Sequence, residues 1–319
     1  MNHPAGLQKM KSKLNGKDFL QISDFTKDEL MDLIEFGMKL KNMQKLGEPH
    51  RYLEGKTLAM IFEKTSTRTR VSFETGMYQL GGMAQFLSKD DIQMGNGETV
   101  ADTAKVLSRF VDAIMIRTFG HDIVVELAEN ATVPVINGLT DDAHPCQVMA
   151  DLMTIYEKKG SFNGLKLAFV GDGNNMSQSL LMGCAIMGID CYVAVPEGNE
   201  IKEGILKMAK EKAKLSGAKI VQTFDPDEAV KDADIVYTDV WASMGWEGDL
   251  EARLAEFADY QVSEELVKGA KSDYLFMHCL PAKRGEEVTA AVIDGENSVV
   301  FDQAENRLHA QKAILVSLM

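Results

Sequence analysis

TLAMIFEKTSTRTR, residues 57–70, decides the fold because a mainly apolar run, a polar turn and the start of a helix follow one another directly. Residues 57–62 have the length and apolar character of a buried strand. After the turn, Phe73, Met77 and Leu80 recur at helical spacing. Free backbone amides and the positive end of the helix dipole attract anions at such a turn. The segment therefore predicts an α/β fold with an anion site after its first strand.

The side chains of this turn indicate which anion binds. Arg68 and Arg70 alternate with the hydroxyl residues Ser66, Thr67 and Thr69. Guanidinium groups match phosphate oxygens in a bidentate geometry, so the pattern favours a phosphate. The alternative is that the serine only caps the helix and the arginines lie on a solvated face.

Composition limits the possible partners. The 319 residues are 45% hydrophobic and 26% charged, which suits a folded protein of two domains. The net charge of −14 argues against a nucleic-acid or anionic-membrane partner. Residues 1–17 lack the apolar core of a secretory signal, and no run approaches the roughly 18 apolar residues of a membrane span. We therefore expect a cytoplasmic protein that holds its anion with a local cluster of arginines.

Strand-like and helix-like stretches alternate along the chain, and the alternation begins again after the turn at 160–164. This pattern predicts two doubly wound parallel-sheet domains, with the active site in the cleft between them. We place the domains at residues 1–142 and 143–303, with a last helix at 304–319 packing back on the first domain. The expected strands are 57–62, 83–87, 113–116, 133–136, 167–170, 191–195, 219–221, 235–237, 274–277 and 299–301. The expected helices are 23–43 with a cap at Thr26, 67–80, 99–110, 123–130, 147–157, 176–187, 201–215 and 304–317.

Polar residues of chemical interest follow several of these strands. They are Arg117, His144 with Gln147, Asp239, and Cys279. Ligands of open α/β sheets bind outside the carboxyl ends of the strands, so this placement indicates a shared site. Each residue alone also has an ordinary interpretation as a cap, a turn residue or a small buried group.

GDGNN at 171–175 has the first two glycines of a dinucleotide fingerprint, and Glu197 follows at about the distance of a ribose-binding acid. An NAD-linked enzyme is therefore a competing interpretation. The third glycine is missing, because position 176 is Met. The amides of Asn174 and Asn175 are suited instead to binding a carboxylate or amino group, which we favour over a nucleotide.

The four cysteines lie far apart without CxxC spacing, which argues against a disulfide framework or zinc knuckle. His144 with Cys146, and His278 with Cys279, offer metal-ligating atoms without the usual ligand spacing. We expect no metal.

Six motifs resemble those of the ornithine carbamoyltransferases in order and spacing, over essentially the whole chain. The pattern after HCLP continues as Ala282-Lys283-Arg284-Gly285, where the family more usually has His at the position of Lys283. The segment DVWASMG offers no basic residues for the second carboxylate of aspartate, which separates the chain from aspartate-specific relatives. The motifs are STRTR (66–70), HPCQ (144–147), GDGNN (171–175), DVWASMG (239–245), HCLP (278–281) and ENR (305–307).

The resemblance implies roles for residues at matching positions. Catalytic roles fall to Arg117, His144, Asp239 and Cys279. Ornithine would contact Asn175, Asp239, Ser243 and Met244. Carbamoyl phosphate would contact Ser66, Thr67, Arg68, Thr69, Arg70, Arg117, His144, Gln147, Cys279, Leu280 and Arg307.

The implied reaction transfers the carbamoyl group to the δ-amine of L-ornithine, giving L-citrulline and phosphate, as in arginine metabolism. It requires no metal or organic cofactor, because the phosphate leaving group already activates the carbonyl. The resemblance also implies a homotrimer or a multiple of trimers. An NAD-linked dehydrogenase, a non-catalytic phosphometabolite-binding protein, and relatives using putrescine or an acylated ornithine remain as alternatives.

Overall fold

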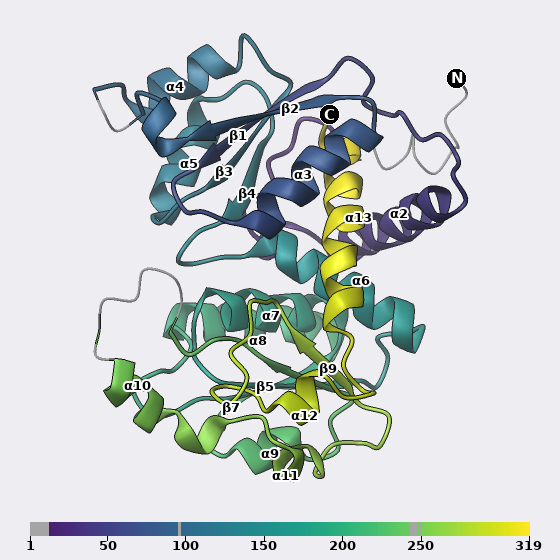
Figure 1. Ribbon diagram of the computed structural model, residues 1–319, viewed down its shortest axis with the longest axis vertical. Helices are drawn as coiled ribbons and strands as arrows, with labels where there is room; N and C mark the ends of the chain where they lie inside the picture. Colours follow the sequence, from purple (N-terminus) through teal and green to yellow (C-terminus); the bar gives the residue numbers. More distant parts are fainter. Residues whose placement is uncertain (1–12, 95–96, 243–247, 249) are drawn as a thin grey trace. The chain divides into compact units, whose positions relative to one another are not determined.

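The computed structural model describes residues 13–94, 97–242, 248 and 250–319. The chain divides into two compact units, Met1–Glu157 with Glu305–Met319, and Lys158–Ala304 (Figure 1). The division falls within the helix Pro145–Lys159, later in the chain than the domain boundary after residue 142 that the sequence predicts. Each unit contains one parallel β-sheet, which confirms the predicted fold class of two parallel-sheet α/β domains.

The first unit is built on a four-stranded sheet with strand order β2-β1-β3-β4. Thr57 pairs with Met83 on one side of β1, and Leu58 pairs with Ala113 on the other. Because β2 and β3 flank β1, the winding direction reverses there, and ligands of open sheets bind at such a point. The elements are η1 (Ile22–Asp24), α2 (Lys27–Lys45), β1 (Thr57–Phe62), α3 (Thr67–Gln79), β2 (Met83–Ser88), η2 (Lys89–Asp91), α4 (Val100–Leu107), β3 (Ala113–Arg117), α5 (His121–Asn130), β4 (Val135–Leu139) and α6 (Pro145–Lys159).

Local sequence signals explain where helix α2 begins. The Thr26 side chain accepts a hydrogen bond from the backbone of Glu29, whose carboxylate accepts one from the backbone of Thr26. This capping box satisfies amides that would otherwise lack partners at the helix start. The predicted cap at Thr26 is confirmed, although the residues before it form the short helix η1 rather than part of α2.

The second unit is built on a five-stranded parallel sheet with order β7-β6-β5-β8-β9. The winding direction reverses between β5 and β8, so the loops after these two strands lie side by side. A hydrophobic core that includes Phe257 and Phe276 packs at this sheet. The elements are β5 (Lys166–Val170), α7 (Asn175–Met187), β6 (Asp190–Ala194), α8 (Glu203–Ser216), β7 (Ile220–Thr223), α9 (Pro226–Val230), β8 (Ile235–Thr238), α10 (Leu250–Glu256), η3 (Ala258–Tyr260), α11 (Glu264–Val267), β9 (Leu275–His278) and α12 (Ala290–Ile293). The last helix, α13 (Val300–Leu318), begins in this unit and belongs to the first unit from Glu305 onward.

The predicted strand at 299–301 is wrong. Val299 donates its backbone N–H to the carbonyl of Phe276, and Ser298 bridges the same residue, so the chain touches the sheet edge for one step. Helix α13 then begins at Val300. A short apolar run has no periodicity that distinguishes a strand from the first turn of a buried helix.

The short helices α9 to α12 were not predicted. They have four to seven residues each, which is too short for a helical pattern to register in the sequence. Over the described part of the chain, no helix has the length and apolarity needed to span a bilayer.

Candidate active site

The turn between β1 and α3 carries the first group of predicted site residues. Ser66 is the N-cap of α3, and its hydroxyl oxygen accepts the backbone N–H of Thr69 at 3.2 Å. The same hydroxyl donates to Thr69 Oγ1 at 3.1 Å. Ser66 therefore caps α3, and the cap also joins two hydroxyl groups at the positive end of the helix.

Arg307 on α13 lies against this turn although it is distant in sequence. Its Nη2 donates to Thr69 Oγ1 at 3.2 Å, and its Nη1 donates to Gln147 Oε1 at 2.7 Å. Gln147 in turn donates from Nε2 to Asp151 at 2.8 Å. Arg307, Gln147 and Thr69 are all buried, so their polar groups are held in fixed orientations.

His144 is a buried histidine surrounded by cationic groups. It directly precedes α6, whose first residue is Pro145, a residue favoured at a helix start. Burial lowers the pKa of His144 well below its usual value, and the charges of Arg307, Arg117 and Arg68 lower it further. The imidazole is therefore neutral at neutral pH, next to arginines that favour an anion.

Arg117 ends strand β3, as expected, and is buried. Its backbone carbonyl accepts the N–H of Glu63, which fixes the end of β3 against the chain leaving β1.

Arg70 is held by contacts within the first unit that do not involve His144. Its guanidinium pairs with Glu74 at 3.2 Å and covers the ring of Phe86 at 3.7 Å. The arginines of the STRTR motif thus have separate surroundings: Arg68 influences His144, while Arg70 contacts α3 and β2.

Cys146, in the HPCQ motif, has a structural role. Its thiol is fully buried and donates to the carbonyl of Asn137 at 3.4 Å. Burial raises the pKa of this thiol to about 12. A thiol that stays protonated is a poor nucleophile and a poor metal ligand.

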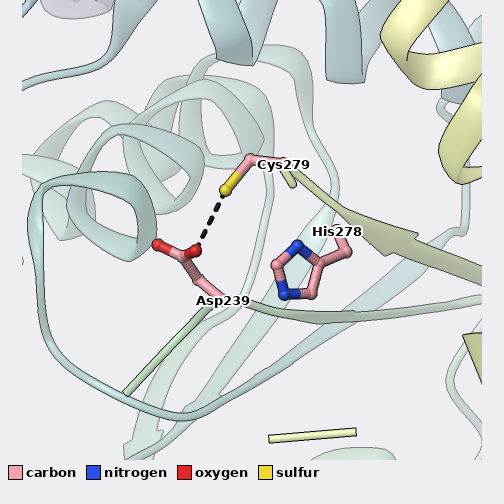
Figure 2. Close-up of side chains that lie close together, drawn as sticks. All are labelled: Asp239, His278 and Cys279. Atoms are coloured by element: carbon pink, nitrogen blue, oxygen red, sulfur yellow. Dashed lines mark hydrogen bonds between the residues drawn. The ribbon is translucent and has the colours of Figure 1, made fainter. Parts of the chain in front are cut away.

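The second unit gathers its polar residues around Asp239, which directly follows β8. Figure 2 shows the thiol of Cys279, which follows β9, pointing at this carboxylate. Cys279 Sγ donates to Asp239 Oδ1 at 3.0 Å, and Asn174 Nδ2 donates to Asp239 Oδ2 at 3.1 Å. Three strand ends, those of β5, β8 and β9, therefore contribute to one cluster, as expected from the parallel sheet.

Asn174, which the motif match does not include among the ornithine contacts, is the neighbour of Asn175 that bonds Asp239. Its Oδ1 accepts the backbone N–H groups of Met176 and Ser177 and so caps α7. These are the amides that a dinucleotide pyrophosphate would need. The N-terminus of α7 is thus already occupied by a side chain, which argues against the NAD interpretation.

Arg253 on α10 is a buried cation near this cluster that the sequence analysis did not single out. It is buried and donates to Asp172 Oδ2 at 2.6 Å, to the carbonyl of Trp241 at 2.8 Å and to the side chain of Asn199. It thereby connects three loops at the carboxyl edge of the sheet. Burial raises the pKa of Asp172, and the arginine opposes that shift. Spacing in the sequence gives no signal for such a contact.

Asp239, His278 and Cys279 are close enough to be considered as a metal site, because their candidate ligand atoms lie within 4.8 Å of one another. Both ring nitrogens of His278 are engaged, however. Nδ1 accepts the backbone N–H of Leu280 at 2.8 Å, and Nε2 faces Glu287 at 3.1 Å. A metal would have to break one of these bonds, so the absence of a metal stays our prediction.

Two of the predicted ornithine contacts, Ser243 and Met244, lie outside the described residues.

Two family models cover nearly the whole chain. The carbamoyl-P binding domain of aspartate/ornithine carbamoyltransferases matches residues 17–157, and the Asp/Orn binding domain matches residues 163–318. The ornithine carbamoyltransferase of Anoxybacillus flavithermus is 60% identical over 319 residues, which is 100% of each chain. The chain belongs to the ornithine carbamoyltransferase family. The members of this family are carbamoyltransferases, and the resemblance drawn from the six motifs is confirmed.

Solved structures of this family agree with the fold. The ornithine carbamoyltransferase of Pyrococcus furiosus has a TM-score of 0.94 at 57% identity, covering 96% of this chain and 97% of that one. The anabolic enzyme of Campylobacter jejuni has a TM-score of 0.89 at 43% identity, covering 94% and 97%. The two domain matches meet near the point where the structure divides, between residues 157 and 163. The arginines around His144 lie in the first unit and the Asp239 cluster lies in the second.

Proposed function

We propose that the first unit binds carbamoyl phosphate and the second binds L-ornithine, and that the protein transfers the carbamoyl group between them. The observation that supports carbamoyl-phosphate binding by the first unit is the neutral, buried His144 among Arg68, Arg117 and Arg307. Such a group of cations suits a dianionic phosphate, and a neutral imidazole can donate a hydrogen bond to a carbonyl without adding charge.

The phosphate would be held by Arg68 and by the hydroxyls and amides at the start of α3. Arg307 already bonds Thr69, so the phosphate would extend an existing network instead of ordering mobile side chains. Gln147 is held by Asp151 and Arg307, in a position to contact the carbamoyl group. Arg70, with its contacts to Glu74 and Phe86, would contribute charge at longer range.

Ornithine would bind by its amino-acid end at Asp239, with Asn175, Ser243 and Met244 as further contacts. A carboxylate on a largely buried loop needs a cationic partner, and the ammonium group of the substrate supplies one. Cys279 would lie beside the δ-amine, and Leu280 beside the carbamoyl group. These roles rest on the motif match and on the bonds that join Asp239 to Asn174 and Cys279.

The chemistry balances without a cofactor. The neutral δ-amine attacks the carbonyl carbon, a C–N bond forms, and the C–O bond to phosphate breaks with its electron pair leaving on phosphate. The ammonium form of ornithine releases two protons in all: one ends on the departing phosphate and one in solvent. Arg117, His144 and Thr69 would stabilise the developing oxyanion. Removing one preorganised donor of this kind typically lowers the rate about 10²- to 10³-fold.

One assay tests this proposal. Carbamoyl phosphate is offered with ornithine, putrescine, N-acetylornithine or aspartate, and the carbamoylated product is measured. We expect turnover with ornithine and little with the other amines. Putrescine lacks the α-carboxylate, and N-acetylornithine lacks the cationic α-amino group, so each leaves polar groups of the site unpaired. Aspartate has no side-chain amine to carbamoylate. Preferred turnover of putrescine or N-acetylornithine would instead assign the chain to that substrate, and no turnover with any amine would refute the proposal.

We propose a trimer, or a multiple of trimers, as the assembly. In the first unit, Val71 and Tyr78 lie on one face of α3 and are 53% and 78% exposed, and Met83 at the start of the edge strand β2 is 54% exposed. A second copy of the chain would cover such an apolar surface. Light scattering measures the mass. Tyr78→Glu should reduce it, while Leu215→Glu, at an 89% exposed position in the second unit, should not.

A cytoplasmic location is also part of the proposal. All four cysteines are free thiols, and three of them are buried. Free thiols persist in a reducing compartment. Cell fractionation with antibody detection tests the location.

A further inference from the structure

His278 and Glu287 form a buried pair that the proposed reaction does not use. Both side chains are fully inaccessible, and His278 Nε2 lies 3.1 Å from Glu287 Oε1. Burying a carboxylate has a large desolvation cost, so its retention in the core calls for a specific task.

The partners of the ring determine where its proton lies. The backbone N–H of Leu280 donates to His278 Nδ1 at 2.8 Å, and a backbone amide can only donate. Nδ1 therefore carries the lone pair, and the ring proton sits on Nε2, facing Glu287. The carboxylate thus selects the one neutral tautomer that can accept the Leu280 amide.

That amide belongs to a residue in an unusual conformation. Leu280 has φ of +59°, in the left-handed region that is unfavourable for a residue with a Cβ. The bond to His278 holds it there. Glu287 Oε1 also accepts the backbone N–H of Lys283 at 2.7 Å, so one carboxylate fixes this segment at two points.

We propose that Glu287 and His278 are positioning residues for the reaction, because they hold the Cys279–Leu280 backbone in its working geometry. The inference rests on the proposed function, in which Cys279 and Leu280 contact the reacting groups. Both side chains are fully inaccessible, so we assign them no direct contact with substrate. Their loss should disturb the ornithine-dependent step and spare binding of inorganic phosphate, whose proposed partners Arg68, Thr69 and Arg307 belong to the other unit.

Two substitutions of His278 separate its two contacts. His278→Asn places a carbonyl oxygen near the position of Nδ1 and can still accept the Leu280 amide. His278→Gln reaches toward Glu287 and leaves that amide without an acceptor. We expect His278→Gln to lower kcat with ornithine about 10²-fold, the usual effect of a small misplacement, while His278→Asn keeps most of the rate. Affinity for phosphate should be equal in both.

Glu287 provides the second pair of variants. Glu287→Gln keeps an oxygen that can accept from His278 and Lys283, and should stay within a few-fold of the parent rate. Glu287→Met removes both acceptors and should resemble His278→Gln. Gln303→Met is the matched control, since Gln303 accepts the backbone N–H of His278 at 3.0 Å but has no part in the Leu280 link. It should lower thermal stability without an ornithine-specific loss of kcat.

Alkylation of Cys279 by iodoacetamide gives a readout that does not depend on turnover, because Cys279 is the one cysteine of the four that is not buried. His278→Gln and Glu287→Met should change its alkylation rate, whereas His278→Asn and Gln303→Met should not. Equal alkylation rates and equal kcat in His278→Gln and His278→Asn would overturn the inference. A parent enzyme inactive with ornithine would instead refute the proposed function, and the alkylation rates would still decide the positioning role.

Discussion

Asn174 donates its side-chain amide to Asp239 Oδ2 at 3.1 Å, while its carbonyl oxygen accepts the first backbone amides of α7. One side chain thus ends the loop after β5 and orients the carboxylate after β8. The amide of Asn174 can serve both partners because it carries a donor and an acceptor in a fixed plane. Stability of α7 and orientation of the proposed ornithine site are therefore coupled at a single residue.

Two substitutions of Asn174 should separate these roles. Serine remains a good N-cap, so Asn174→Ser should melt close to the parent, whereas Asn174→Ala should lose about 1 kcal/mol of stability. Both variants lose the donor to Asp239. Since a hydrogen bond to a charged group contributes about 1.5–3 kcal/mol, the KM for ornithine should rise about tenfold or more in both. Thermal melts and steady-state kinetics check the prediction. An unchanged ornithine KM in Asn174→Ser would leave Asn174 as a cap only.

The arginines of the STRTR motif should differ in importance. Arg68 adds to the field around His144, whereas Arg70 is held by Glu74 and Phe86. Arg68→Ala should weaken carbamoyl phosphate far more than ornithine, about 10²-fold, because a charge-assisted contact to the phosphate is lost. Arg70→Ala is the matched control and should weaken it only a few-fold. Calorimetric titration with phosphate or carbamoyl phosphate measures both. Equal losses would place Arg70 in the site as well.

The fold followed from the sequence because its signals are local and repeated. Strand β1 was predicted with its true limits, and β5 and β8 to within one residue at each end, since buried parallel strands are short apolar runs. The helix cap at Thr26 was visible as a residue pattern. The strand expected at 299–301 failed because one contact with Phe276 precedes a helix, and no periodicity reveals that.

Sequence reasoning also located the groups at the strand ends, but it could not supply their partners. The bonds from Arg307 to Thr69 and from Arg253 to Asp172 join residues far apart in the chain. Charge type and spacing carry no information on such pairs. Likewise, the neighbours Asn174 and Asn175 are equivalent in sequence, and only the geometry of the cap distinguishes them.

Asp239→Asn tests the ornithine half of the proposal. The substitution keeps the shape and removes the charge, so a cationic α-amino group in a largely buried site loses its carboxylate partner. We expect the ornithine KM to rise about 10- to 100-fold with nearly unchanged binding of carbamoyl phosphate. Asp234→Asn, in the same unit and paired with Lys271, controls for general destabilisation. Unaltered ornithine kinetics would make Asp239 a turn residue.

Acid should destabilise the first unit through its buried histidines. Burial lowers the pKa of His309 to about 3, with a further contribution from the charge of Lys312, and the pKa of His144 is lowered in the same direction. A lowered pKa means that the unfolded chain binds the proton more readily. The stability that these buried, neutral histidines contribute to the folded state is thus fully present above about pH 6.5, and it falls as the pH drops toward 3.

His309→Gln removes one of these titrating groups and should reduce the loss of stability between pH 7.5 and pH 5 by about 1–2 kcal/mol. His121→Gln is the matched control, at the start of α5 in the same unit. Urea unfolding at the two pH values measures the difference. If both variants lose as much stability as the parent, His309 does not contribute to acid sensitivity.

Cys279 provides the test of how the nucleophile is oriented. Its thiol donates to Asp239 at 3.0 Å, and the proposed function places the δ-amine beside it. The amine must be neutral to attack and its free pKa resembles that of lysine, about 10.4, so the parent rate should rise from neutral toward alkaline pH. Cys279→Ser keeps a hydrogen-bond donor but places it on a shorter side chain. We expect carbamoyl phosphate affinity to persist while the ornithine-dependent rate falls about tenfold, equivalent to about 1.4 kcal/mol. If the serine variant keeps the rate and pH profile of the parent, the thiol only packs against the amine, and Asp239 with the bound phosphate must orient it.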